Sequence, residues 1–166
     1  HLCLQAPERA HRCAGVNHDF DFGGQRFTFA GPRALFWKER RALLVADLHL
    51  EKASWFAARG QMLPPYDSRE TLARLAVLVE AHDPAEIWAL GDSFHDDAGP
   101  QRLDSGTIAQ IERLGRGRRI VWIAGNHDAR AAVPGERTEE AVVDGIVLRH
   151  EVRADEIRPE LSGHYH

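Results

Sequence analysis

Residues 118–128 read Arg-Arg-Ile-Val-Trp-Ile-Ala-Gly-Asn-His-Asp, an apolar run followed directly by a polar motif. The run is short and rich in β-branched and aromatic residues, which is typical of a buried strand. Asn126 and His127 would then stand just beyond the carboxyl end of that strand, where open α/β sheets bind their ligands. The stretch therefore predicts a strand of the central sheet and part of a site at its end.

Two earlier apolar runs, residues 41–46 and 86–90, also end in polar motifs, and two further histidine motifs follow later in the chain. A single aspartate after a strand is more often a turn residue or a helix cap. Five motifs in one chain favour a shared site instead. In order, they are Asp47-Leu48-His49, Gly91-Asp92-Ser93-Phe94-His95, Gly125-Asn126-His127-Asp128, His150 and Gly163-His164-Tyr165-His166.

The residue types in these motifs are those that bind divalent metal ions. Asp, Asn and His are ligands of hard to borderline cations. A bridging carboxylate such as Asp92 can hold two cations ~3.5–4 Å apart. Neutral Asn and His ligands limit the negative charge, so a water between the cations would lose its proton near neutral pH and act as a nucleophile. The motifs therefore predict a dinuclear centre suited to phosphoryl chemistry.

The two ends of the chain differ in pattern from its middle. Phenylalanines alternate around Gly23-Gly24 as in a hairpin, whereas the middle alternates strands with helices, which implies parallel pairing. We expect a mixed α/β (α+β) fold, a four-layer αββα sandwich of two mixed sheets flanked by helices. The expected strands lie at 20–29 (a hairpin), 34–37, 41–46, 86–90, 118–124, 141–143 and 146–149, and the expected helices at 51–59, 68–82 and 103–114.

Length and composition bound the protein class. A chain of 166 residues suits one domain, expected at 19–166 after a polar arm at 1–18 that is native or left by cloning. The net charge of −4 argues against binding nucleic acid through bulk positive charge. Cys3 and Cys13 lack zinc-site spacing; they could form a bridge with each other, but two free cytoplasmic thiols are the favoured interpretation. No apolar run approaches the length of a membrane span, so we expect no membrane association.

The motifs resemble those of the calcineurin-like metallophosphoesterase superfamily over residues 44–166. The resemblance implies that His127 contacts the scissile phosphate. The Gly-Asp-x-x-His form resembles the nuclease branch, in which His95 would orient His127 or assist the leaving group. Family members continue beyond the last motif, so the fold is expected to be truncated after His166. The implied metal ligands are Asp47, His49, Asp92 and His166 for one ion, and Asp92, Asn126, His150 and His164 for the other.

Residues 47–52, 63–67 and 90–95 are together similar to the PdeM family, the bacterial ligase-associated DNA damage response endonucleases. That resemblance implies two divalent ions, with manganese favoured over iron, zinc or magnesium, and single-stranded DNA as the substrate. It also implies association with a DNA ligase, a helicase and a second nuclease in DNA repair. Lys52 and Trp55 are candidate substrate contacts, although a solvated lysine and a core tryptophan are the simpler interpretations.

Three functions are open on these grounds. The first is a DNA endonuclease that hydrolyses phosphodiesters by in-line attack of a metal-bridging hydroxide. The second is a small-molecule phosphodiesterase or pyrophosphatase acting on a nucleotide or lipid-linked diphosphate, which the acidic net charge favours and the Gly-Asp-x-x-His form opposes. The third is a non-catalytic scaffold, which the complete set of ligand residues opposes.

Overall fold

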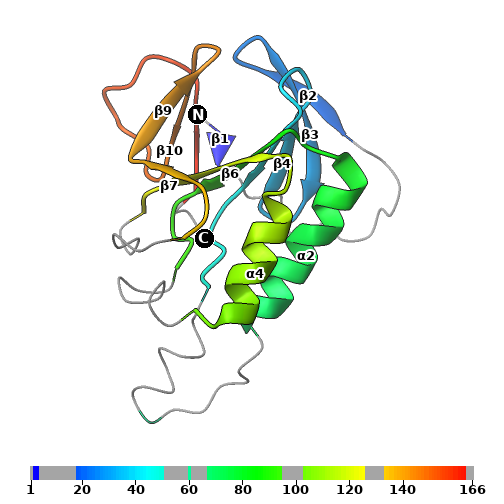
Figure 1. Ribbon diagram of the computed structural model, residues 1–166. Coiled ribbons are helices and arrows are strands. Elements are labelled where there is room, and N and C mark those ends of the chain that lie inside the picture. Colours follow the sequence, from blue (N-terminus) through cyan, green and yellow to red (C-terminus); the bar gives the residue numbers. More distant parts are fainter. Residues whose placement is uncertain are drawn as a thin grey trace.

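The computed structural model of the chain describes residues 2–3, 18–50, 60, 67–94, 103–125 and 133–163. Two helices and two β-sheets lie within these residues (Figure 1). The helices are α2 (Asp67–His82) and α4 (Ser105–Leu114). The strands are β1 (Leu2–Cys3), β2 (Asp19–Phe22), β3 (Gln25–Gly31), β4 (Ala34–Trp37), β5 (Ala42–Val45), β6 (Glu86–Leu90), β7 (Arg119–Ile123), β8 (Glu136–Thr138), β9 (Glu140–Val143), β10 (Ile146–Arg149) and β11 (Glu160–Ser162).

The larger sheet has the strand order β2-β3-β4-β5-β6-β7-β8 and changes its pairing at β5. Strands β2 to β5 pair antiparallel, as the hairpin pattern predicts. Strands β5 to β8 pair parallel, as the alternation of strands with helices predicts. The smaller sheet has the order β1-β11-β10-β9 and is also mixed, because β10 pairs antiparallel with β9 and parallel with β11. The predicted pair of mixed sheets is therefore confirmed.

Both faces of the central parallel strands are buried. On one face, Ile87 and Ala89 of β6 pack in a cluster with residues of α2 and α4. On the other face, Trp88 and Leu90 pack with residues of the smaller sheet such as Leu148. Two buried faces explain why the central strands read as nearly continuous apolar runs. Figure 1 shows the resulting order of layers, with α2 and α4 side by side against the larger sheet and the smaller sheet beyond it.

The helix predicted at 68–82 is confirmed as α2, and the helix predicted at 103–114 begins two residues late as α4. The later start has a physical reason. The Asp104 carboxylate accepts a hydrogen bond from the Thr107 amide at 2.7 Å, so Asp104 caps the helix instead of joining it. The helix expected at 51–59 lies outside the described residues.

Three short strands were not expected from the sequence, namely β1, β8 and β11. Strand β1 pairs parallel with β11 although it falls in the segment taken as an arm, and the division at residue 18 stays a prediction. Over the outer face of the smaller sheet, the described residues contain no helix, so the fourth layer also stays a prediction. No helix in the described part of the chain is long and apolar enough to cross a membrane.

Candidate metal centre

The side chains that follow β5 and β6 meet at one edge of the larger sheet. Asp47 and His49 follow β5, and Asp92 follows β6, its parallel neighbour. One potential ligand atom from each of the three residues lies within 4.8 Å of the other two. Both aspartates are buried, at 7% and 6% exposed. The two loops are tied together by the backbone, because the His49 amide donates to the Asp92 carbonyl at 3.0 Å.

The backbone at these three residues is strained. Asp47, His49 and Asp92 have φ values of 52°, 46° and 44°. These values lie in the left-handed region that residues other than glycine rarely adopt. Such a conformation costs about 1–3 kcal/mol and persists only where the surrounding structure enforces it. Three strained residues in one cluster indicate that the chain is shaped to direct these side chains toward a common point.

His150 follows β10 of the smaller sheet and reaches the same cluster. Its Nδ1 lies 3.4 Å from the Leu90 carbonyl, a contact that matches the tautomer with the proton on Nδ1 and the lone pair on Nε2. Nε2 in turn lies 3.3 Å from Oδ1 of Asp92. Oδ1 is buried and accepts no hydrogen bond from any residue that the structure describes. In that tautomer, Nε2 of His150 and Oδ1 of Asp92 are two electron-pair donors that face each other. A cation bound to both would stabilise this arrangement.

Three glycines allow the loops to approach so closely. A Cβ on Gly91 would collide with the His150 ring, and Gly91 also has a φ of 74°. A Cβ on Gly125 would lie 2.7 Å from Oδ1 of Asp92 and would collide with the Asp92 amide. A Cβ on Gly163 would collide with the Leu90 carbonyl. The glycines of three predicted motifs are thus required by contact between strand ends, where any larger residue would separate the loops.

Two surface depressions flank the cluster. One of about 320 Å³ lies beside Asp47, and Arg33 and Arg74 are among its lining residues. Nη1 of Arg33 lies 4.0 Å from Oδ2 of Asp47. The other depression, of about 640 Å³, lies beside His150. Its lining residues are Ala124, Gly125, Glu139, Glu140, Arg149, His150, Glu151, Val152 and Arg153.

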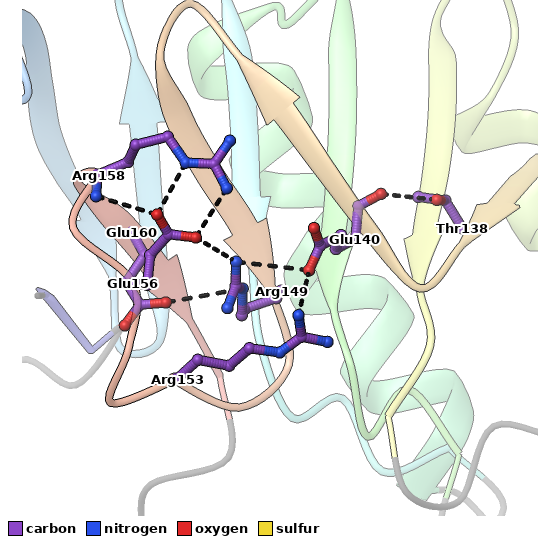
Figure 2. A network of polar contacts seen from close by, with 7 residues as sticks. All are labelled: Thr138, Glu140, Arg149, Arg153, Glu156, Arg158 and Glu160. Atoms are coloured by element: carbon purple, nitrogen blue, oxygen red, sulfur yellow. Dashed lines mark hydrogen bonds and ion pairs between the residues drawn. The ribbon is translucent and has the colours of Figure 1, made fainter.

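A network of ion pairs surrounds Arg149, the residue before His150 (Figure 2). The Arg149 side chain is 4% exposed and donates to Glu156 at 2.8 Å. It also lies 3.4 Å from Glu140 and 3.6 Å from Glu160. Hydrogen bonds from Arg158, with a further one from Arg149, hold the pKa of Glu156 far below its ordinary value. The network anchors β10 at the point where it delivers His150.

The structure brings together four of the predicted metal ligands, which are Asp47, His49, Asp92 and His150. The remaining predicted site residues lie outside the described residues. They are His95, Asn126, His127, His164 and His166, with the candidate substrate contacts Lys52 and Trp55. Gly125 and Gly163, which precede Asn126 and His164 in sequence, lie against the cluster.

Sequence reasoning did not single out Arg33. Its proximity to Asp47 arises from the pairing of β4 with β5, and only the turn residues Gly31-Pro32 hinted at that arrangement. Arg116, Arg118 and Arg119 form a basic cluster at the start of β7. Arg118 and Arg119 are in fact occupied by partners: Arg118 donates to the Pro84 carbonyl, and Arg119 donates twice to Glu136.

The residues present fit a divalent cation. Two carboxylates and two imidazoles converge, and the buried Oδ1 of Asp92 has no hydrogen-bond donor among the described residues to balance its charge. Oxygen and nitrogen donors of this kind suit manganese, magnesium, iron or zinc. A cation would also reduce the repulsion between Asp47 and Asp92, which lie close together at low solvent exposure.

Comparison with known proteins agrees with this geometry. The crystal structure of Pseudomonas putida nuclease MPE is similar, with 31% sequence identity and a TM-score of 0.70 over 90% of this chain and 73% of that chain. No curated protein matches by sequence. The model of the calcineurin-like phosphoesterases matches residues 40–159, a span that contains the cluster and the strands that carry it. The chain therefore belongs to the calcineurin-like phosphoesterase family.

Proposed function

We propose that this protein is a divalent-metal-dependent endonuclease that hydrolyses phosphodiesters in single-stranded DNA. The observation that carries the proposal is the cluster of Asp47, His49, Asp92 and His150, in a chain 31% identical to a bacterial nuclease. Manganese is the metal we propose, as one of two bound ions. A cytoplasmic role in DNA repair, alongside a ligase, a helicase and a second nuclease, is part of the same proposal.

The ligands we propose extend beyond the described residues. Asn126, His164 and His166 would complete the two metal sets, which is supported by the contacts of Gly125 and Gly163 with the cluster. Cations bound there supply Lewis acidity to the phosphoryl oxygens and lower the pKa of water. The strained loops and the Arg149 network then serve to hold the ligands in place before substrate binds, so that little reorganisation is needed during the reaction.

Two histidines in the proposed mechanism act on the substrate. His127 donates a hydrogen bond to a non-bridging oxygen of the scissile phosphate and stabilises the charge that develops there. His95 orients His127 or delivers a proton to the leaving oxygen. Both residues lie outside the described part of the chain, and both roles follow from the family's motif pattern.

The test is nicking of circular single-stranded DNA in the presence of manganese. We expect the protein to convert circles to linear strands, and we expect chelation or His127→Ala to abolish that conversion while the fold is retained. His18→Ala, a histidine at an exposed position outside the cluster, is the matched control and should keep full activity. Full activity in His127→Ala would show that the role assigned to His127 is wrong.

A small phosphodiester is the second candidate substrate. The observation in its favour is that the depression beside His150 is lined by three glutamates (Glu139, Glu140 and Glu151) against two arginines (Arg149 and Arg153), an excess of negative charge that disfavours a polyanion. Comparing turnover of a cyclic nucleotide with that of single-stranded DNA separates the two functions. Faster turnover of the cyclic nucleotide would replace DNA as the proposed substrate and leave the metal centre unaffected.

A further inference from the structure

We propose that the depression beside Asp47 is a second phosphate subsite, in which Arg33 binds the substrate phosphate next to the scissile one. This inference rests on the proposed function, because only a substrate with several phosphates could use such a subsite. The depression has a volume of about 320 Å³ and lies between the turn that joins β3 to β4, the end of β5 and helix α2. Asp47 and Arg33 both line it, so the subsite is continuous with the candidate metal centre.

The backbone of Arg33 supports a functional role. Pro32 and Arg33 form a two-residue turn between Gly31 and Ala34, which pair across β3 and β4. Arg33 has a φ of 57°, and in a turn that begins with proline this second position favours glycine or asparagine. An arginine at such a position adds strain that glycine would avoid. The strain is consistent with a functional side chain, and the position of the side chain distinguishes Arg33 from Arg41, whose φ of 51° is similar.

The position of the guanidinium group matches that role. The Ala46 amide donates to the Arg33 carbonyl at 3.2 Å, which fixes the turn against the residue before Asp47. Nη1 of Arg33 lies 4.0 Å from Oδ2 of Asp47, while the Arg33 side chain is 41% exposed and that of Asp47 only 2%. The guanidinium thus stands between a buried candidate ligand and solvent. Its five donors allow it to face the carboxylate and a phosphate at once.

The negative net charge of the protein favours such a contact if the substrate is a polymer. Bound cations would offset the charge of the scissile phosphate, but each neighbouring phosphate also carries a negative charge and approaches a protein of net charge −4. Other arginines near this sheet are engaged away from the centre: Arg41 and Arg118 bind Asp83, and Arg119 binds Glu136. Among the described residues, Arg33 is the arginine that pairs with a candidate metal ligand.

Arg74 shares the depression but has a different environment. It pairs with Glu70 one turn earlier on α2, and its side chain is 78% exposed. An exposed pair of this kind contributes little, so Arg74 can reach a phosphate only as a weak auxiliary group. The principal contact of the subsite is therefore assigned to Arg33.

The test compares two substrates in two variants. The substrates are a single-stranded oligonucleotide and bis(p-nitrophenyl) phosphate, a diester with a single phosphate. The variants are Arg33→Gly and its matched control Arg41→Gly. Arg41 also has a positive φ, of 51°, and an exposed side chain that pairs with an aspartate, but that aspartate is Asp83, outside the cluster. Glycine relieves the backbone strain at both positions, so changes in stability should be alike and small.

We expect Arg33→Gly to raise KM for the oligonucleotide about tenfold, the size of one lost hydrogen bond to a charged group. The slope of log KM against log salt concentration should fall by about 0.7, the value for one phosphate contact on a single strand. Turnover of the small diester and the affinity for manganese should stay unchanged. Arg41→Gly should behave as the unmodified protein with both substrates.

Two results would overturn the subsite. An equal loss on both substrates would mean that Arg33 acts through Asp47 and the metal centre, and an unchanged KM and salt slope would mean that Arg33 contacts no phosphate. The failure of the proposed function has a different signature. If the unmodified protein hydrolyses the small diester but leaves the oligonucleotide intact, DNA is not the substrate. The proposed subsite is then wrong as well.

Discussion

Arg149 and His150 are adjacent in sequence, but each belongs to a different cluster of acidic side chains. The two clusters differ in how the carboxylates are balanced by positive charge. Around Arg149, Glu140, Glu156 and Glu160 are matched by arginines. Around His150, the Asp92 carboxylate lies 3.3 Å from an imidazole nitrogen, and no arginine or lysine among the described residues pairs with it. One cluster is neutral by itself, whereas the other has a deficit of positive charge.

The contrast separates structural charge from functional charge. The first cluster counts three arginines (Arg149, Arg153 and Arg158) against three glutamates, so it supplies its own counter-ions. The second combines buried carboxylates with strained backbone at Asp47, His49 and Asp92. Strain and unbalanced charge destabilise a protein unless a ligand compensates for them. We infer that the second cluster binds cations and that the first cluster stabilises the conformation of the second.

The largest expected effect is that of Asp92→Asn. The variant should lose more than ~100-fold in metal-dependent activity, because partners of metal ligands alone are worth ~10–100-fold. Manganese should stabilise the unmodified protein by about 2.7 kcal/mol at 100 times Kd and should not stabilise the variant. Calorimetric titration measures manganese binding, and thermal unfolding measures the stabilisation by manganese. Without metal, the variant should be at least as stable as the parent, since a buried charge is removed.

A less stable Asp92→Asn protein in the absence of metal would contradict this account of the second cluster. It would mean that the Asp92 carboxylate already has a stabilising partner.

Arg149→Met should affect stability more than chemistry. Removing the arginine deprives the buried Glu160 of its paired cation, which costs about 3–5 kcal/mol, while Glu156 keeps its pair with Arg158. Urea unfolding measures the change. Arg158→Ala is the control, since its side chain is 45% exposed and an exposed ion pair contributes less to stability. If the two variants unfold at the same urea concentration, the Arg149 cluster is not a structural anchor.

Gly163→Ala tests the close approach of the strand ends. The added methyl group would collide with the Leu90 carbonyl, so we expect a loss of about 1–3 kcal/mol in stability together with weaker manganese binding. Gly31→Ala is the matched control, because its Cβ would meet Leu78 at an ordinary 3.6 Å. Normal manganese affinity in a destabilised Gly163→Ala protein would show that this close packing of the loops is not needed for metal binding.

The smallest effect concerns pH. Arg158 and Arg149 depress the pKa of Glu156 below its ordinary 4.5 in the folded state. The stability that Glu156 contributes is therefore present above about pH 4.5 and lost as the pH falls below it. Glu156→Gln should lower Tm at pH 7, and the difference from the unmodified protein should narrow steadily as the pH falls below about 4.5. A difference in Tm that is constant with pH would contradict this assignment.

The sequence predicts the parts of the fold that have strong local patterns. Strands β5, β6 and β7 and helix α2 follow from apolar runs and helical spacing. Strands β8 and β11, which read Glu-Arg-Thr and Glu-Leu-Ser, are too short and polar to show a strand period. Their pairing is decided by the neighbouring strand, which no local pattern reveals.

The candidate site also has features that the sequence predicts and features that it does not. Asp47 and Asp92 were predicted because parallel strands place their carboxyl ends at one edge. The tautomer of His150, the fit of Gly125 against Asp92 and the position of Arg33 depend on contacts between segments far apart in sequence. Such contacts follow from tertiary packing, so a single sequence could name the motifs but not their geometry.

Anomalous diffraction from crystals soaked in manganese tests the central claim most directly. The account predicts two peaks ~3.5–4 Å apart, a separation typical of dinuclear centres. One peak should lie among Asp47, His49 and Asp92, and the other between Asp92 and His150. No peak at Asp92, or peaks confined to the glutamates around Arg149, would contradict the claim that the unbalanced charge at Asp92 exists to bind metal.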